Sequence, residues 1–455
     1  MRFASWAAAA LLLGVAPAWG QDLPIHTRTL DNGLDVIVIE NHAVPLVTVE
    51  LDVKNGAYTE TPEYDGLSHL YEHMFFKANR VIPNQEKYLE RTNELGATWN
   101  GTTSTERVNY YITLGVDSLE AGMQFMEDAI RYPLFLQEEL VRERPVVLGE
   151  YDRAESNPFF HLGRATDTLL WSPEYYSRKN TIGDREVIST TTTEKMKTIQ
   201  ERFYVPNNSA LVLSGDITAV RGFALAERIF GDWPRGGDPF ATPVPDPPPL
   251  AATRTVVVEQ PVNTVTVTVS WHGPGVAADP DATYAADVFA QILANPTSTF
   301  QKELVESGLA FGASFSYFTQ RHVGPIQVAA QTTPDKALEV HRAILDQVER
   351  FDDPGYVTDE QLAAAKTAVR ISQIYDQEQA SSFAHLVGFW WAVAGLDYFL
   401  GYVDNMQDVS AEDIAAFSRD YMIGKPHVNG VLIHPEARAA SGLAAEALMA
   451  QEVLQ

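Results

Sequence analysis

The chain of 455 residues contains no cysteine. It can therefore form no disulfide bond, and any metal site in it must be built from histidine and carboxylate side chains rather than from thiolates. Hydrophobic residues make up 45% of the sequence, which is enough for two or more packed cores. A chain of this length predicts roughly two to three domains.

Basic residues are also scarce. The 33 Lys and Arg residues stand against 60 Asp and Glu residues, so the formal net charge is −27. Such a chain would repel the phosphates of nucleic acid, and we therefore expect no nucleic-acid partner. The negative charge does not identify a substrate, because acidic surfaces commonly serve solubility.

No apolar run in the sequence is long enough to cross a bilayer. The run Ala7–Val15 follows Arg2 and precedes the small-x-small site Ala18-Trp19-Gly20. This pattern predicts a signal peptide over residues 1–20 and a mature chain that begins at Gln21 without a membrane span. We therefore expect export, to the periplasm if the source is a Gram-negative bacterium. A membrane anchor is the alternative, which the short apolar core disfavours.

The most informative stretch is His69-Leu70-Tyr71-Glu72-His73. In a helix, residues four apart differ in direction by about 40°, so His69 and His73 would project from one face and could bind one metal ion. Glu72 lies beside them and could act as a general base on an activated water. This is the spacing of the inverted zinc-peptidase motif H-x-x-E-H. Two histidines on a helix are more often structural, so the motif needs a further ligand.

A carboxylate from another element is the expected third ligand. Catalytic zinc held by two histidines typically takes one carboxylate and leaves its fourth position to water. Glu143 and Glu150 are the candidates. Pro145 lies between them and either kinks one helix or begins a new one, so the spacing alone does not fix how the two side chains point.

These residues resemble the M16 family of zinc metallopeptidases, which includes pitrilysin, insulysin and the mitochondrial processing peptidases. In that family the third ligand follows the last histidine of the motif by about 77 residues, and Glu150 follows His73 at this interval. The resemblance implies one Zn²⁺ per chain, bound by His69, His73 and Glu150. It makes Glu72 the catalytic base. Glu143, at the family's second acidic position, would assist catalysis by orienting a ligand or balancing charge; a solvated helix charge is the alternative.

Other segments extend the resemblance over essentially the whole mature chain. They are Asn32-Gly33-Leu34, Asn55-Gly56-Ala57, Phe75-Phe76-Lys77-Ala78 and Asn100-Gly101-Thr102-Thr103. In the family, peptide substrates add to the last of these as an extra strand. The resemblance therefore implies that Asn100, Gly101 and Thr102 bind substrate through main-chain hydrogen bonds. Without the resemblance, this segment reads as an ordinary exposed strand edge.

The chain has a doubled organisation. The proline-rich linker 239–252 cannot hold regular structure and separates a domain 21–238 from a domain 253–455. Each half is expected to contain an early alternating strand, Leu46–Val53 or Thr264–Trp271. Each is expected to end with a helix followed by a strand: Thr193–Tyr204 with Ser209–Ser214, and Ser410–Tyr421 with Val428–Ile433.

Only the first half can carry the metal, because the matching region of the second half, around Tyr284–Leu293, contains no histidine. By resemblance the fold is α+β: two homologous M16-type domains, each a mixed, largely antiparallel sheet with helices packed on one face. The aromatic run Phe389-Trp390-Trp391 is expected to pack in a core or between the domains.

One segment departs from the family pattern. Active single-chain members carry an Arg and a Tyr in the second half, within a segment that reads R-E-x-x-G-L-A-Y. Here Leu304 stands at the Arg position and Phe311 at the Tyr position. This pattern resembles the zinc-bearing subunit of the heteromeric branch. The expected function is therefore a zinc endopeptidase acting on peptides or unfolded segments, as the catalytic subunit of a heterodimer with an Arg/Tyr-bearing homologue. The alternative is a non-catalytic scaffold subunit of a larger complex.

Overall fold

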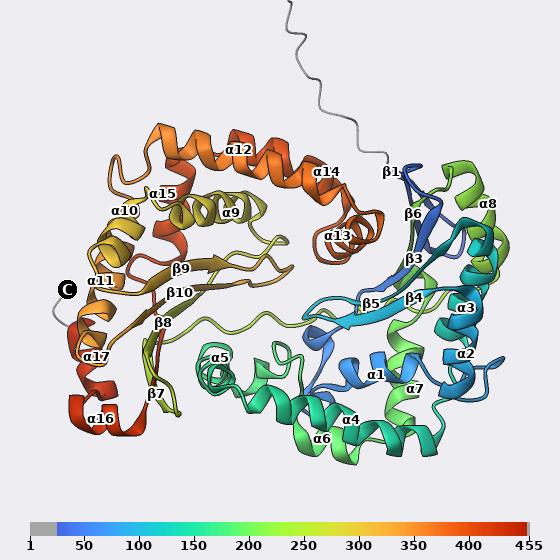
Figure 1. Cartoon of the computed structure of the whole chain (residues 1–455), viewed down its shortest axis with the longest axis horizontal. Helices are drawn as coiled ribbons and strands as arrows, with labels where there is room; N and C mark the ends of the chain where they lie inside the picture. Colours follow the sequence, from blue (N-terminus) through green and yellow to red (C-terminus); the bar gives the residue numbers. More distant parts are fainter. Residues whose placement is uncertain (1–24, 453–455) are drawn as a thin grey trace, which may run out of the picture.

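The computed structural model describes residues 25–452, so the predicted signal peptide 1–20 and Gln21 lie outside the described residues. The chain forms two mixed sheets, of six and five strands, each accompanied by helices (Figure 1). Residues 231–253, which include the proline-rich linker, contain neither helix nor strand. The sheets lie on either side of this segment, while the domain boundaries 21–238 and 253–455 stay a prediction.

The first half contains the six-stranded sheet, in the order β1-β2-β6-β3-β5-β4. Its elements are β1 Ile25–Thr29, β2 Asp35–Glu40, β3 Leu46–Val53, α1 Leu67–Phe75, α2 Gln85–Leu95, β4 Thr98–Thr103, β5 Val108–Gly115, α3 Leu119–Arg131, α4 Gln137–Glu155, α5 Pro158–Tyr176, α6 Arg185–Thr190, α7 Thr193–Phe203, β6 Ser209–Gly215 and α8 Ala219–Phe230. The predicted strand Leu46–Val53 is confirmed, and the predicted last helix and strand are confirmed to within one residue.

The second half contains the five-stranded sheet, in the order β7-β11-β8-β10-β9. Its elements are β7 Arg254–Glu259, β8 Val265–His272, α9 Pro280–Ala294, α10 Thr299–Gln301, a π-helical turn Lys302–Glu306, β9 Gly312–Tyr317, β10 Pro325–Thr332, α11 Ala337–Glu349, α12 Asp359–Asp376, α13 Ala380–Val393, α14 Leu396–Asp408, α15 Ala411–Tyr421, β11 Val428–Ile433, α16 Pro435–Ser441 and α17 Ala445–Glu452. Strand β8 lies one residue later than predicted.

The two sheets have the same topology once β1 is set aside. Strands β2, β6, β3, β5 and β4 correspond in order to β7, β11, β8, β10 and β9. In each sheet one pair is parallel, β2 with β6 and β7 with β11, and every other pair is antiparallel. The prediction of two related, largely antiparallel sheets is therefore confirmed. Helix α9 follows β8 as α1 follows β3, and it is the helix that lacks histidine.

The period-two alternation of side chains along the strands gives each sheet two faces with different neighbours. In β2, Val36 and Val38 belong to the core of the first half, where α8 packs on β2. Ile37 and Ile39 point the other way and join the core of the second half. Helices of the first half thus cover one face of their own sheet, as predicted, while its other face meets the opposite half.

The two halves exchange helices across this inner face. Helix α5 of the first half packs on β7, β8 and β11, and the corresponding helix α13 of the second half packs on β3 and β6 (Figure 1). The indole nitrogen of Trp391 on α13 donates a hydrogen bond to Asp35 on β2 at 2.9 Å. Gly388, also on α13, lies against Asp52 of β3, and this close approach requires glycine because a Cβ atom there would lie 2.2 Å from Oδ2 of Asp52. The prediction that the aromatic run packs between the domains is therefore confirmed for Trp391.

No single helix within residues 25–452 is long and apolar enough to cross a membrane. Helices α13 and α14 pass that test only as a pair, and the pair is bent by 102°. Trp390 and Trp391, on the first of these helices, are buried.

Candidate metal centre

Helix α1 carries the H-x-x-E-H motif, as predicted, and its start is fixed by two features. Gly66 precedes the helix with a φ of +87°, and a Cβ atom there would lie 2.4 Å from Cα of Gly183, so the position requires glycine. The buried carboxylate of Glu60 accepts hydrogen bonds from the backbone N–H groups of Gly66 and Ser68, at 2.7 and 2.6 Å. A side chain from the preceding loop therefore serves as the N-terminal cap that the helix itself lacks.

Helix α4 carries both candidate glutamates, and it runs without interruption through Pro145. The proline removes one backbone hydrogen bond but begins no new helix. Glu143 and Glu150 are therefore about two turns apart on one continuous helix, and their side chains point to the same side. That side packs on α1. The sequence left this relation open, and the continuous helix decides it.

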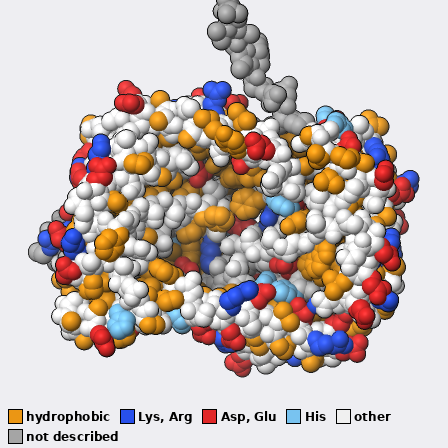
Figure 2. Space-filling model, viewed as in Figure 1, with side chains coloured by type: hydrophobic (Ala, Val, Ile, Leu, Met, Phe, Trp, Pro, Cys, Tyr) orange, Lys and Arg blue, Asp and Glu red, His pale blue; other side chains and the backbone are white. Residues whose placement is uncertain are grey.

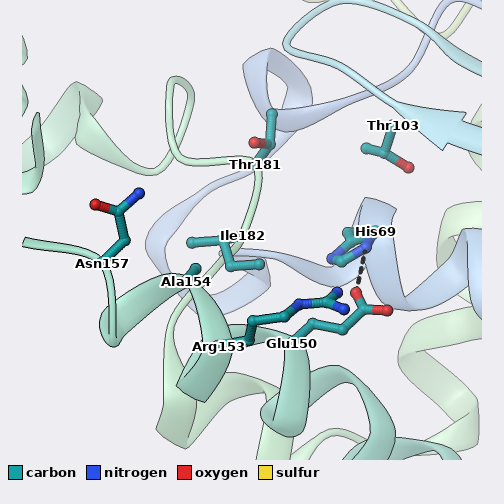
Figure 3. Close-up of a pocket in the computed structure, with 8 residues that line it drawn as sticks. All are labelled: His69, Thr103, Glu150, Arg153, Ala154, Asn157, Thr181 and Ile182. Atoms are coloured by element: carbon teal, nitrogen blue, oxygen red, sulfur yellow. Dashed lines mark ion pairs between the residues drawn. The ribbon is translucent and has the colours of Figure 1, made fainter. Parts of the chain in front are cut away.

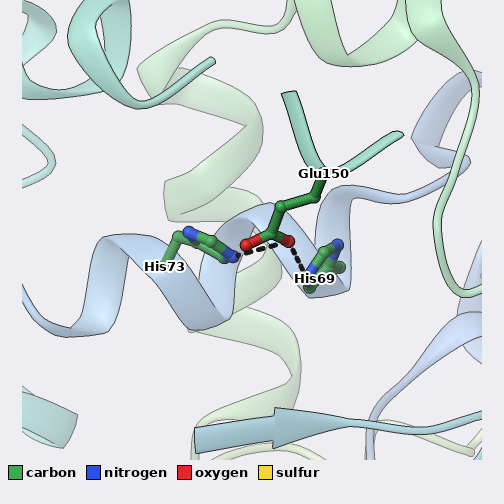
Figure 4. A group of neighbouring side chains, drawn as sticks. All are labelled: His69, His73 and Glu150. Carbon is green, nitrogen blue, oxygen red and sulfur yellow. Dashed lines mark ion pairs between the residues drawn. The ribbon is translucent and has the colours of Figure 1, made fainter. Parts of the chain in front are cut away.

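His69, His73 and Glu150 converge at one point between α1 and α4 (Figure 4). Oε2 of Glu150 lies 3.4 Å from Nε2 of His69 and 3.6 Å from Nε2 of His73. In tetrahedral zinc sites with bonds of about 2.0 to 2.2 Å, neighbouring donor atoms are about 3.3 to 3.6 Å apart. The three side chains thus fit a single zinc ion with two nitrogen donors and one oxygen donor.

Glu143 does not face the point where the three donors converge. It contacts the other ring nitrogen of His73. Its Oε1 accepts a hydrogen bond from Nδ1 of His73 at 2.9 Å, and its Oε2 pairs with Nζ of Lys77 at 2.5 Å. Burial opposes ionisation of Glu143, but the hydrogen bonds from His73 and Lys77 hold its pKa below the usual value. An ionised carboxylate can only accept, so Nδ1 carries the proton and Nε2 keeps its lone pair for a metal.

The two histidines differ in their electrostatic surroundings. Burial, with a smaller contribution from His73, lowers the pKa of His69 to about 4, which keeps that ring neutral and able to donate electrons. Burial also opposes protonation of His73, but the hydrogen bond to Glu143 and the charge of Glu150 raise its pKa. A bound cation would compete with this proton for Nε2. Nδ1 of His69 is buried without a hydrogen-bond partner among the described residues.

Glu72 stands beside these donors without being one of them. Its Oε2 accepts a hydrogen bond from Oγ1 of Thr103 on β4 at 2.7 Å. Its side chain also fills the space above Gly101, where a Cβ atom would lie 3.0 Å from Cγ and 3.1 Å from Oε1 of Glu72. Burial raises the pKa of Glu72, and the hydrogen bond from Thr103 only partly offsets that effect. The result is a positioned carboxylate with raised proton affinity.

The predicted substrate segment lies on β4, at the edge of the first sheet, where it pairs with β5 alone. Gly101 lies against Glu72, whereas the hydroxyl of Thr102 donates a hydrogen bond to Asn109 of β5. Asn100 is exposed. A cavity of about 440 Å³ adjoins this edge, and its lining includes all three residues together with the donor side chains and Glu72. Thr102 can therefore offer a ligand its backbone while its side chain is engaged within the sheet.

The sequence assigned no individual role to three of these supporting residues, Glu60, Lys77 and Thr103, although Thr103 was the last residue of the segment expected to receive the substrate. Lys77 lay within a recognised landmark, and an ion pair with Glu143 could have been considered from its charge. Glu60 and Thr103 are ordinary polar residues in a loop and a strand, and only the tertiary structure brings them to α1.

The hollow between the two halves is open on the face shown in Figure 2.

Comparisons with known proteins agree with this geometry. The family described as insulinase (peptidase family M16) matches residues 35–170, and the family described as peptidase M16 inactive domain matches residues 190–369. This chain belongs to peptidase family M16. An uncharacterized zinc protease of Rickettsia felis is 23% identical to it over 375 residues, which cover 80% of this chain and 87% of that protein.

Solved structures share the M16 fold. The crystal structure of a protease from Helicobacter pylori has a TM-score of 0.81 at 20% identity, covering 90% of this chain and 100% of that one. The first half of the periplasmic protease PqqL from Escherichia coli has a TM-score of 0.77 at 18% identity, covering 95% of this chain and 97% of that one. At these identities the structural likeness shows the two-domain fold alone.

The departure from the M16 pattern in the second half has a structural counterpart. Leu304 lies in the π-helical turn Lys302–Glu306 and is fully buried in the core of the second half. Phe311, directly before β9, is 64% exposed. Neither residue lines the cavity beside the metal centre. The second half of this M16 chain therefore presents no Arg or Tyr side chain at these two positions.

Proposed function

We propose that this M16 chain is a zinc-dependent endopeptidase that hydrolyses peptides or unfolded segments. The observation that carries the proposal is the convergence of His69, His73 and Glu150 beside a separate, hydrogen-bonded Glu72. A scaffold protein would have no physical need for a carboxylate with raised pKa next to three converging donors. The name of the Rickettsia felis relative, a zinc protease, supports the same choice of metal.

Each side chain of the centre has a distinct role in the proposed reaction. His69, His73 and Glu150 hold the metal, and Glu143 with Lys77 fixes the His73 ring. Zinc would supply a Lewis acid that polarises the scissile carbonyl and makes water a better nucleophile. Glu72 accepts the proton of the attacking water and then delivers it to the departing amine. Thr103 keeps the Glu72 carboxylate in place for both transfers.

A bound peptide would lie along the free edge of β4. A peptide that adds to this edge forms main-chain hydrogen bonds, which tolerate many sequences. The path leads over Gly101, which lies against Glu72, so the backbone of a bound peptide would pass close to the base. This arrangement favours extended or unfolded segments over folded proteins, because only extended chains can add as a strand.

We further propose that the chain is the catalytic subunit of a heterodimer. Leu304 and Phe311 cannot donate side-chain hydrogen bonds to a substrate carbonyl, so these donors would have to come from a homologous partner with the Arg/Tyr pair. Export is also proposed, from the signal-like residues 1–20 and from the likeness to a protease described as periplasmic.

The proposal is tested by measuring cleavage of an unstructured peptide by the purified chain with and without stoichiometric zinc. Activity should require zinc, disappear with a chelator and return when zinc is added. The heterodimer is tested separately by adding an Arg/Tyr-bearing homologue. A chain that binds no zinc would be a scaffold rather than a peptidase. The same holds for a chain that binds zinc but cleaves no peptide, either alone or with the Arg/Tyr-bearing homologue.

A further inference from the structure

A second cavity adjoins the metal centre on the side away from Trp99 and Gly101. It has a volume of about 380 Å³ and lies beyond Thr103, the last residue of β4 (Figure 3). His69, Thr103 and Glu150 line both this cavity and the one along β4. A peptide that lies along β4 and crosses the metal centre would therefore enter the second cavity with the residues on one side of the cleaved bond.

Arg153 brings a positive charge to this second cavity. It follows Glu150 by three residues on α4, so the two side chains share one face of the helix. They form no ion pair, because the Glu150 carboxylate is turned toward His69 and His73. Figure 3 shows the guanidinium of Arg153 pointing into the cavity beside Glu150 and His69. The guanidinium makes no hydrogen bond or ion pair with any residue in the range 25–452.

The rest of the cavity lining suits a small charged group. Asn157 and Thr181 supply polar side chains, and Ala154 and Ile182 supply an apolar wall. Oδ1 of Asn157 accepts a hydrogen bond from the backbone of Phe159, which leaves its NH₂ group as a donor. A planar guanidinium binds a carboxylate through two parallel hydrogen bonds, a geometry that few other ligands match.

We propose that Arg153 forms a subsite for a carboxylate group of the peptide substrate. This inference rests on the proposed peptidase function and adds a preference to it. The chain as a whole is acidic and repels acidic peptides, so a preference of this kind would be local to one substrate position. The carboxylate could belong to an Asp or Glu side chain or to the C-terminus of the peptide.

The direction of the bound peptide separates these two sources. If the peptide adds to β4 in the antiparallel sense, its residues before the cleaved bond lie beyond Thr103, in the Arg153 cavity. An internal acidic side chain would then be the ligand. If it adds in the parallel sense, the residues after the cleaved bond lie there, and a C-terminal carboxylate can reach Arg153.

The test uses a labelled, unstructured, amidated peptide with a Gln that is replaced by Glu at successive positions around the cleaved bond. A second series keeps Gln but ends in a free carboxylate at successive positions. Binding is measured by fluorescence anisotropy with the Glu72→Gln variant, which should not cleave the peptide. kcat/KM is measured with the unsubstituted chain. We expect one position at which a carboxylate improves both the affinity and kcat/KM by about two- to five-fold, because Arg153 is exposed and solvent screens its pair with a carboxylate.

Variants at Arg153 decide the origin of that preference. With Arg153→Gln, the Glu and Gln peptides should have equal affinity and equal kcat/KM. With Arg153→Glu, the preference should reverse, so that a peptide with Lys at this position is favoured. Arg221→Gln, which removes the same charge from an exposed residue of α8, should keep the preference for the Glu peptide over the Gln peptide. The inference is wrong if no position prefers a carboxylate, or if Arg153→Gln keeps the preference.

Two further outcomes are distinguishable from these. If Arg153→Gln slows cleavage of all peptides equally and leaves binding unchanged, Arg153 acts on the reacting carbonyl, and the subsite proposal is wrong. If the chain neither binds nor cleaves any peptide, neutral ones included, the peptidase proposal itself fails, and this inference falls with it.

Discussion

Glu143 accepts a hydrogen bond from Nδ1 of His73 at 2.9 Å, while Nε2 of the same ring faces Glu150 at 3.6 Å. The two glutamates of α4 therefore contact opposite sides of one imidazole. Glu150 is placed to bind metal, and Glu143 is placed to orient the ring that binds it. This division of roles can be tested with one substitution at each position.

Glu150→Gln should strip zinc from the chain, because an anionic donor becomes a neutral and poorer one. Glu143→Gln should retain most of the zinc at saturating concentration but weaken its affinity by about tenfold to a hundredfold, as the loss of a partner behind a metal-binding histidine does. Metal content after gel filtration and zinc affinity by competition with a chelator measure both effects. The opposite ranking, with zinc lost from Glu143→Gln and kept by Glu150→Gln, would mean that the third ligand is misassigned.

Glu72→Gln should keep zinc and remove peptidase activity. The amide keeps the size of the side chain and an oxygen that accepts from Thr103, but it cannot take a proton from water. Loss of a general base costs about a hundredfold to ten-thousandfold in kcat. Stoichiometric zinc with residual activity in this range supports the assigned role. Loss of zinc in Glu72→Gln would identify Glu72 as a ligand instead.

Gly101→Ala should lower kcat without lowering zinc content. The new Cβ would lie 3.0 Å from Cγ of Glu72 and 3.1 Å from Cε2 of Phe76, so it would push the base out of place by a few tenths of an ångström. Misplacement of a catalytic group by about 1 Å can cost about a hundredfold in rate, and we expect a loss of about tenfold. The matched control is Gly312→Ala on β9, the corresponding edge strand, where a Cβ meets nothing within 4 Å. Equal losses in the two variants would contradict the packing of Glu72 on Gly101.

The sequence predicted local features of the fold and site well and tertiary ones less well. The strand Leu46–Val53 was predicted to the residue, because apolar and polar side chains alternate along it, although the structure buries both of its faces. The doubled topology followed from similar patterns at the ends of the two halves. The side chains His69 and His73 share a helix face in any regular helix, so their convergence needed no tertiary information.

Relations that depend on packing between distant segments could not be predicted. The course of α4 through Pro145 is one, because a proline interrupts some helices and is tolerated in others according to their surroundings. The cap that Glu60 supplies to α1 is another, since no local pattern joins a loop carboxylate to a helix six residues later. The exchange of α5 and α13 between the halves is a third, because an amphipathic pattern does not specify which sheet a helix covers.

Asp287, on α9, should make the stability of the second half depend on pH. Burial raises its pKa to about 7, although hydrogen bonds from Tyr402 and Thr319 oppose that rise. The folded chain therefore binds this proton more tightly than the unfolded chain does. The stabilising effect is fully present below about pH 4 and is lost as the pH rises to about 7.

Asp287→Asn should remove this dependence, because the amide still accepts from Tyr402 but carries no titrating proton. The midpoint of thermal unfolding is measured for the variant and for the unchanged chain from pH 5 to pH 8. As the pH rises, the midpoint of the variant should increase relative to that of the unchanged chain. Asp281→Asn, which removes an exposed carboxylate from the same helix, is the matched control for the loss of one negative charge. A constant difference for Asp287→Asn would show that this carboxyl titrates normally.

The isolated chain should cleave peptides poorly and gain activity from an Arg/Tyr-bearing homologue. Phe311 has no donor, and Leu304 is fully buried, so an Arg restored at that position would place an uncompensated charge in the core. On the heterodimer proposal, the partner supplies these donors in trans. Loss of one such donor to the developing oxyanion costs about a hundredfold to a thousandfold in kcat. Turnover of one unstructured peptide by the chain, by the partner and by their mixture should differ on this scale, with a heterodimer detected by light scattering. Full activity of the isolated chain, unchanged by the partner, would mean that other residues stabilise the transition state and that the heterodimer proposal is wrong.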